Sequence, residues 1–222
     1  MLDKVAMLFL LLGVCTALMI VKDALRRPGV SPLITIAWTI GGFYMPFIGW
    51  LAWWHFGRTR NSRTVLYPHR PDLRRATPAG VFISTSLTAS GCVAGAMLAL
   101  ALLPLFSQVM PDSPRLCHAI FSSLLSLLIG CIMQILYRRQ SHQLCWVPAG
   151  IALIKNDLLS IIAWQAGMFL YLELAVHFLL QDTLWPNQLA CWFMLQIAFF
   201  SGFVFAWPVN KTHLEKGHHP SA

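Results

Sequence analysis

Charged residues are scarce in this chain. Only 11% of its 222 residues are Asp, Glu, Lys or Arg, and its mean hydropathy is +0.64, whereas soluble domains carry about a quarter charged residues. So little charge cannot coat a water-soluble domain of this size, which excludes a soluble enzyme, a nucleic-acid-binding module and a disordered tail. The 57% of apolar residues, about 127 side chains, suffice for about six membrane-spanning helices of roughly 20 residues each.

The sequence also lacks the common motifs of metal and cofactor sites. Its six cysteines form no CxxC pair, and we find no HExxH, no glycine-rich phosphate loop and no nucleophile paired with a base. The pattern therefore predicts no metal site and identifies no cofactor, and it favours a protein that is not an enzyme.

What the sequence does contain is a series of long uncharged runs. Because unpaired backbone groups are costly in lipid, such runs cross a membrane as helices or as a closed barrel, and continuous apolar runs favour helices. We therefore expect an all-α, polytopic transmembrane bundle over residues 1–210, followed by a short cytoplasmic tail over 211–222. The expected spans lie near 5–21, 33–55, 80–104, 116–136, 157–180 and 186–207.

The basic residues predict an orientation. With six spans, 12 of the 16 Lys and Arg residues share one side, which by the positive-inside rule places both termini in the cytoplasm of a bacterial inner membrane. Six arginines lie between Arg58 and Arg75 against one acid, Asp72. This loop is expected to rest on anionic lipid, at about 1 kcal/mol per basic residue, or else to bind an anionic ligand or partner.

The fifth expected span holds the ionisable residues of greatest interest. Glu173 and His177 are four residues apart, so they share one helix face and could form a proton relay, half of a metal site or a hydrogen-bonded pair between helices. Asp157 lies about 160° away from Glu173 around the helix. At the start of the span it is expected to cap free backbone N–H groups.

Small residues dominate the third expected span. Gly91 and Gly95 have the GxxxG spacing that lets two helices approach closely, either within the bundle or in a homo-oligomer. In the second expected span, Pro46 predicts a kink after Gly41 and Gly42.

Several segments resemble the bacterial integral membrane proteins grouped as the domain of unknown function family numbered 4396. The resemblance is carried by residues 155–168, 177–178 and 192–210, with weaker matches at 45–49 and 54–58. It implies no established activity. Many members of that family carry a His-Cys-Gly-x-Gly-Cys-x-x-Gly-Asp motif in the third helix. Here Gly91, Cys92 and Gly95 match it, but its His, first Cys and Asp positions are occupied by Leu87, Thr88 and Ala96. One remaining thiol cannot make a metal site.

Two functions remain open from the sequence. The first is a small transporter-like bundle that binds a solute or ion, with a path lined by Asp157, Gln165, Glu173, His177 and Cys92. The second is a non-catalytic scaffold or accessory subunit, which docks a membrane partner through its small-residue helix faces.

Overall fold

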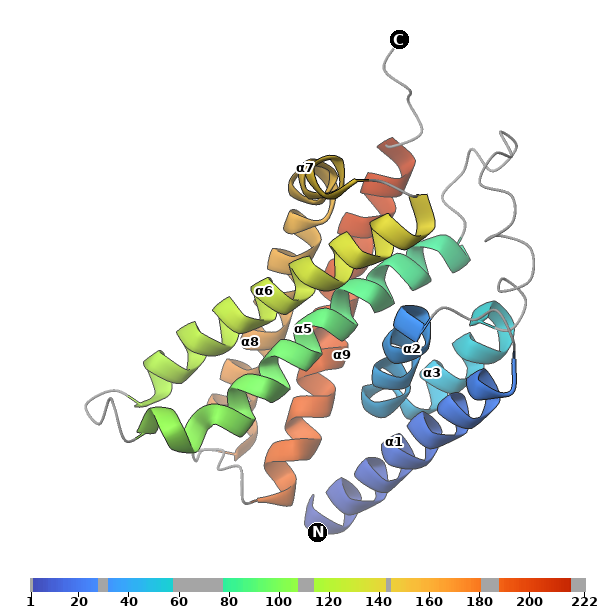
Figure 1. Cartoon of the computed structure of the whole chain (residues 1–222). Coiled ribbons are helices and arrows are strands. Elements are labelled where there is room, and N and C mark those ends of the chain that lie inside the picture. The colour runs from blue at the N-terminus through green and yellow to red at the C-terminus, as the bar shows by residue number, and fades with distance from the viewer. Residues whose placement is uncertain are drawn as a thin grey trace.

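The structure is a computed structural model that describes residues 2–27, 32–57, 78–107, 114–142, 145–180 and 188–216, and within these ranges every regular element is a helix (Figure 1). In chain order, the elements are α1 Leu2–Leu25, α2 Pro32–Tyr44, α3 Pro46–Ala52, the π-helical turn η1 Trp53–Gly57, α5 Pro78–Ser107, α6 Pro114–His142, α7 Trp146–Asn156, α8 Leu158–Leu174, the π-helical turn η2 Ala175–Leu180 and α9 Leu189–Lys216. The predicted all-α class is confirmed.

Five helices are long and apolar enough to cross a membrane. The candidate spans are Asp3–Leu25, Pro78–Leu102, His118–Gln140, Leu158–Phe178 and Leu189–Glu215. Their outward faces are apolar, as on α6, where Leu124, Leu128 and Ile132 follow one another at helical spacing and are all exposed. Apolar stripes of this length are stable in lipid and unfavourable in water. The five helices therefore indicate a membrane-embedded bundle.

The second expected span, 33–55, is not one helix. The chain breaks at Met45, whose φ of −127° and ψ of 69° are not helical, because the following Pro46 disfavours a helical conformation in the residue before it. Beyond the break α3 folds back on α2. A Cβ placed on Gly49 would lie 2.8 Å from the Cα of Gly42, so only glycines allow this approach. We call α2, α3 and η1 the hairpin.

The hairpin enters and leaves the bundle at the same end. At its outgoing side Trp53 donates a hydrogen bond to Asp23, near the end of α1, at 2.9 Å, and the ring of Phe56 lies 5.9 Å from that of Phe82, near the start of α5. The kink expected at Pro46 is thus a reversal of direction, and the described residues contain five long helices and a hairpin where the sequence predicted six spans.

The two ends of the described chain lie at opposite ends of the bundle (Figure 1). Near the start of α1, the ring of Phe9 lies 5.4 Å from that of Phe193, near the start of α9. At the other end of α9, the ring of Trp207 lies 6.0 Å from Phe82, near the start of α5. The end of α1 also lies near the start of α5, because Trp53 binds Asp23 and Phe56 packs against Phe82. Helix α1 therefore runs in the same direction as α9.

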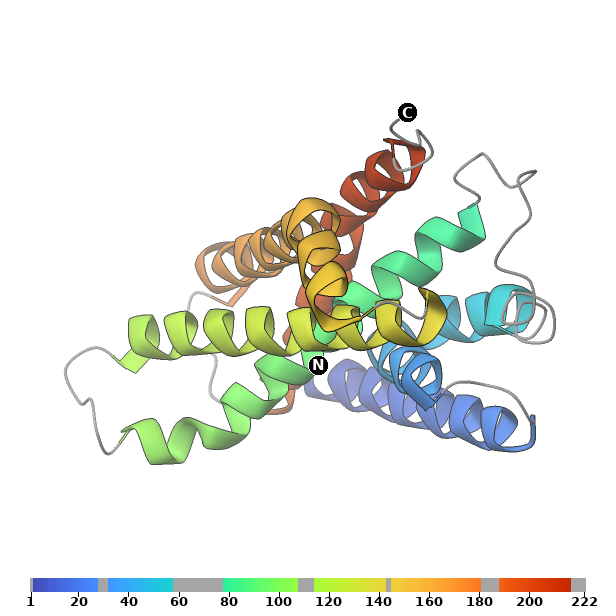
Figure 2. The ribbon, with the colours of Figure 1, turned by 45° about the horizontal axis from the view of Figure 1, so that its top comes forward.

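Helix α5 is central to the packing and contacts α6 most extensively (Figure 2). The structure places Gly91 and Gly95 at this contact. A Cβ on Gly91 would lie 2.7 Å from the Cα of Gly130, and one on Gly95 would overlap the backbone of Ser126. The small-residue face of α5 is thus occupied by α6 of the same chain.

Helix α7 was not expected from the sequence. It packs against α6 and α8 at the end of the bundle where α9 ends (Figure 1). Ala149 and Leu153 are buried, while Val147, Ile151 and Ile154 on the other face are exposed. A short helix with one exposed apolar face is typical of a segment that lies along a membrane surface.

We expect Gly95→Ala to lower the thermal stability of the detergent-solubilised protein. The new methyl group meets the backbone of α6, and overpacking of this kind costs roughly 1–3 kcal/mol. Gly41→Ala is the matched control, because a Cβ at Gly41 meets nothing within 4 Å and alanine favours a helix over glycine. Equal melting temperatures for the two variants would show that the α5–α6 contact is not tight.

Candidate functional site

Polar side chains are buried together where α5, α6, α8 and α9 meet. They share low exposure and hydrogen bonds that cross between helices, and we call them the polar cluster: Thr85, Thr88, Gln134, Arg138, Asp157, Ser160 and Asn210. Burying such groups is costly unless they are paired, so their concentration in one place requires an explanation.

The centre of the polar cluster is the hydroxyl of Thr88 on α5. Its Oγ1 donates to the carbonyl of Ser84 at 3.2 Å and accepts from Gln134 Nε2 of α6 at 2.7 Å and from Ser160 Oγ of α8 at 3.4 Å. One hydroxyl thereby joins three helices. Thr88 and Ser160 are fully buried.

A second pair connects α5 to α9. Thr85 Oγ1 donates to the carbonyl of Val81 at 2.8 Å and accepts from Asn210 Nδ2 at 3.1 Å. Asn210 is only 2% exposed. Thr85 lies one helical turn from Thr88, so both bonds are on the same region of α5.

The charged part of the polar cluster is an ion pair between α6 and the start of α8. Arg138 places both Nε and Nη2 at 2.7 Å from Asp157 Oδ2. The side chains are 19% and 8% exposed, respectively. Arg138 follows Gln134 by four residues and Asp157 precedes Ser160 by three, so the ion pair lies one turn from the bonds of Thr88.

Asp157 occupies the expected position but makes a different interaction. It is the N-cap residue of α8, yet its side chain makes no capping hydrogen bond and pairs with Arg138 instead. The expectation that it caps the helix was therefore wrong. Asp157 lies just before the candidate span Leu158–Phe178. Burial raises the pKa of its carboxyl above the ordinary value, and the guanidinium of Arg138 opposes that rise.

Glu173 and His177 lie elsewhere. His177 Nε2 is 3.5 Å from Glu173 Oε2, so the two residues meet on one helix face. Their side chains are 74% and 71% exposed for Glu173 and His177, respectively, and the pair is near the end of α8 that is remote from Asp157. The structure does not join this pair to the polar cluster.

The remaining two residues of the expected path have separate surroundings. Gln165 is partly buried and donates to the carbonyl of Ser123 at 3.1 Å, which holds α8 against α6. Cys92 is fully buried, and its Sγ lies 3.2 Å from where a Cβ on Gly130 would be. Within the described ranges no three His, Cys, Asp or Glu residues are grouped as metal ligands.

Sequence reasoning missed most of the polar cluster. Arg138 was counted only among the basic residues that mark the topology, and Thr88 was named only at the position of the first Cys of the family motif, although Gln134 and Arg138 are spaced four apart on one helix face. That spacing, together with the acid Asp157 at the start of the next span, was the signal that could have predicted a polar contact between the two helices. Asn210 gave no such signal, because its partner is 125 residues away.

A bundle of five apolar helices with a buried polar cluster defines a polytopic helical membrane protein. Residues 79–219 match the family described as a domain of unknown function, DUF4396, and the chain belongs to that family. The match begins in α5 and includes the whole polar cluster. No curated protein and no solved structure matches the chain.

Breaking the ion pair should destabilise the protein more than removing it. Arg138→Met or Asp157→Leu alone leaves a charge buried without its partner. Each change should lower the free energy of unfolding by up to about 3 kcal/mol. The double variant Arg138→Met with Asp157→Leu should lose less than the sum of the two, as measured by thermal unfolding of all three in one detergent.

Glu173→Gln is the control for these two single variants and the double variant. Because the pair with His177 is exposed, its loss should change stability by no more than about 0.5 kcal/mol. Additive single effects at Arg138 and Asp157 would contradict a coupled pair.

Proposed function

We propose that this protein binds a small polar solute or ion inside its membrane-embedded bundle, as a transporter-like protein does. The observation that carries the proposal is the buried ion pair of Arg138 and Asp157 beside the bonds of Thr88. Arg138 lies within the candidate span His118–Gln140 and Asp157 directly before the span Leu158–Phe178. Ionisable groups buried in membrane bundles are costly and commonly mark ion or substrate sites. Replacing a buried ion pair by apolar residues is often neutral or stabilising, so stability alone does not account for it.

The chemistry of the polar cluster suits such a solute. It offers a carboxylate, a guanidinium, an amide and hydroxyls within one helical turn of each other, at the end of the bundle where α6 ends and α8 begins. These groups can exchange their mutual bonds for bonds to a ligand. The hairpin adds support, because helices broken within a membrane bundle are a feature of many transporters.

The alternative of a scaffold depended on the small-residue face of α5. That face is occupied by α6 at Gly130 and Ser126. A partner or a second copy would therefore need a different surface, and we favour ligand binding over docking.

The hairpin also changes the orientation that we propose. With five crossings, α1 begins on one side and α9 ends on the other. If α9 ends in the cytoplasm, 14 of the 16 Lys and Arg residues belong to cytoplasmic ends and connections, and only Lys4 and Arg115 lie outside. This is a stronger bias than six spans allow. We therefore propose a bacterial inner-membrane protein with a cytoplasmic C-terminus, an external N-terminus and anionic lipid at its basic cytoplasmic face.

Native mass spectrometry of the protein released from its membrane tests the proposed function. Wild-type protein should carry a bound small molecule or ion, and the double variant Arg138→Met with Asp157→Leu should lose it while remaining folded. Glu173→Gln should retain it. A wild-type spectrum without any such ligand, or equal occupancy in the double variant, would favour the scaffold.

Cysteine labelling in intact cells tests the orientation. In a background without the six native cysteines, Asp3→Cys should react with a membrane-impermeant maleimide, whereas Glu215→Cys should react only after permeabilisation. Protection of both positions in intact cells would show that both termini are cytoplasmic and that the hairpin region crosses the membrane.

A further inference from the structure

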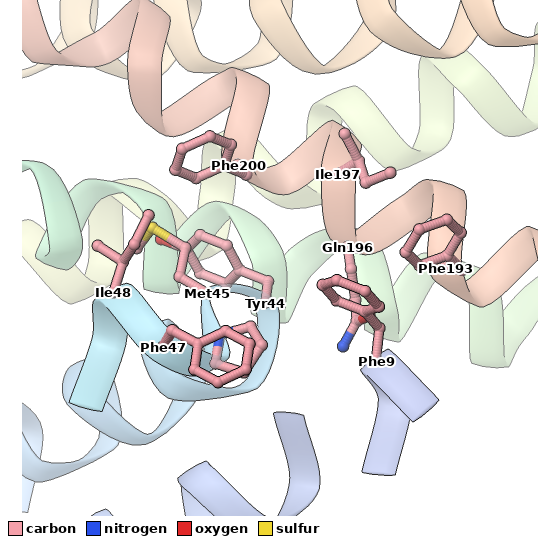
Figure 3. Close-up of a pocket in the computed structure, with 10 residues that line it drawn as sticks. Phe9, Tyr44, Met45, Phe47, Ile48, Phe193, Gln196, Ile197 and Phe200 are labelled. Atoms are coloured by element: carbon pink, nitrogen blue, oxygen red, sulfur yellow. The ribbon is translucent and has the colours of Figure 1, made fainter. Parts of the chain in front are cut away.

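A pocket of about 270 Å³ lies at the tip of the hairpin (Figure 3). Its walls come from the tip, which we define as residues 44–48, from the first half of α1 and from the first half of α9. Aromatic side chains dominate, among them Phe9, Phe47, Phe193 and Phe200. Phe47 is 61% exposed, so the pocket opens toward the lipid-facing side of the bundle.

Two polar side chains of the lining have incomplete hydrogen bonding among the described residues, the hydroxyl of Tyr44 and the amide of Gln196. Gln196 of α9 is only 3% exposed, and its Nε2 donates to the carbonyl of Phe43 at 2.9 Å. That carbonyl can only accept, which fixes the orientation of the amide. Gln196 Oε1 is buried and finds no donor among the described residues. Figure 3 shows the amide between Phe9 and the hairpin tip.

These features define the chemistry of an occupant. A buried acceptor without a donor is costly, so a ligand that brings an O–H group to Gln196 gains more than a hydrocarbon chain does. Aromatic walls favour a ring, which can pack edge-on or offset against them. The pocket is larger than a cavity of about 150 Å³ that holds benzene, so a ring with a short alkyl group fits.

We propose that this pocket binds a lipid-soluble phenol, whose ring packs among the phenylalanines and whose hydroxyl donates to Gln196 Oε1. Among the described residues no charged side chain lines the pocket, so the phenol binds in its neutral form. The site is separate from the polar cluster and does not depend on the function proposed for it.

A matched pair of probes tests the hydrogen bond directly. The full-length protein in lipid nanodiscs is titrated with 4-butylphenol and with 4-butylanisole, its methyl ether, which has the same ring but no O–H donor. Binding is measured by saturation-transfer NMR against empty nanodiscs. We expect the wild type to bind the phenol at least about fivefold more tightly than the ether, since the bond satisfies a buried acceptor.

Two variants locate the binding. Gln196→Leu should abolish the preference for the phenol over the ether. This variant also loses the hydrogen bond to the carbonyl of Phe43, which stabilises the hairpin. Ile48→Trp is therefore made in parallel at a half-exposed lining position. It should fill the pocket and reduce phenol binding to the level of empty nanodiscs. Equal wild-type affinity for both probes, or phenol binding unchanged in Ile48→Trp, would overturn the proposal.

Discussion

The structure depends on one constraint, which is that polar groups in an apolar interior must find partners within the protein. Regular helices satisfy most of the backbone. Buried polar side chains then bond mainly to backbone carbonyls, and several of these bonds cross between helices. Gln165 binds the carbonyl of Ser123, and Ser201 binds that of Gly167 at 3.0 Å. Bonds of this kind fix which helices are neighbours where apolar contacts alone, which lipid can replace, do not.

The same constraint explains how the hairpin can exist. A break at Met45 disturbs the backbone bonding of the residues around it, and the protein compensates from outside the hairpin. Gln196 of α9 donates to the carbonyl of Phe43. Gly13 of α1 lies directly against that carbonyl, where a side chain would block it. The reversal is thus stabilised by α1 and α9 together, and the hairpin is not an independent unit.

The sequence supported correct predictions where a single property decides the structure. Uninterrupted apolar runs located the five long helices, because transfer from water to lipid acts on each run separately. The sequence did not support correct predictions where the interacting residues are far apart along the chain. Pro46 indicated a kink, but the reversal needs Gly42 and Gly49 in contact and Gln196 from another helix. Residues 146–156 are amphipathic and too short to span, so α7 was missed. Asp157 was assigned to the nearest free N–H groups, whereas Arg138, 19 residues earlier, binds it.

The region matched by the family carries an additional implication. Residues 79–219 contain every member of the polar cluster, whose bonds all run among α5, α6, α8 and α9. The pocket at the hairpin tip needs α1 and α3, which lie before this region, and shares only α9 with it. The polar cluster is therefore a structure that the matched region can build from its own helices, whereas the pocket requires the N-terminal third of this chain. Because α9 contributes Asn210 to one and Gln196 to the other, a shift of α9 along its axis would alter both together, and this helix is the physical connection between them.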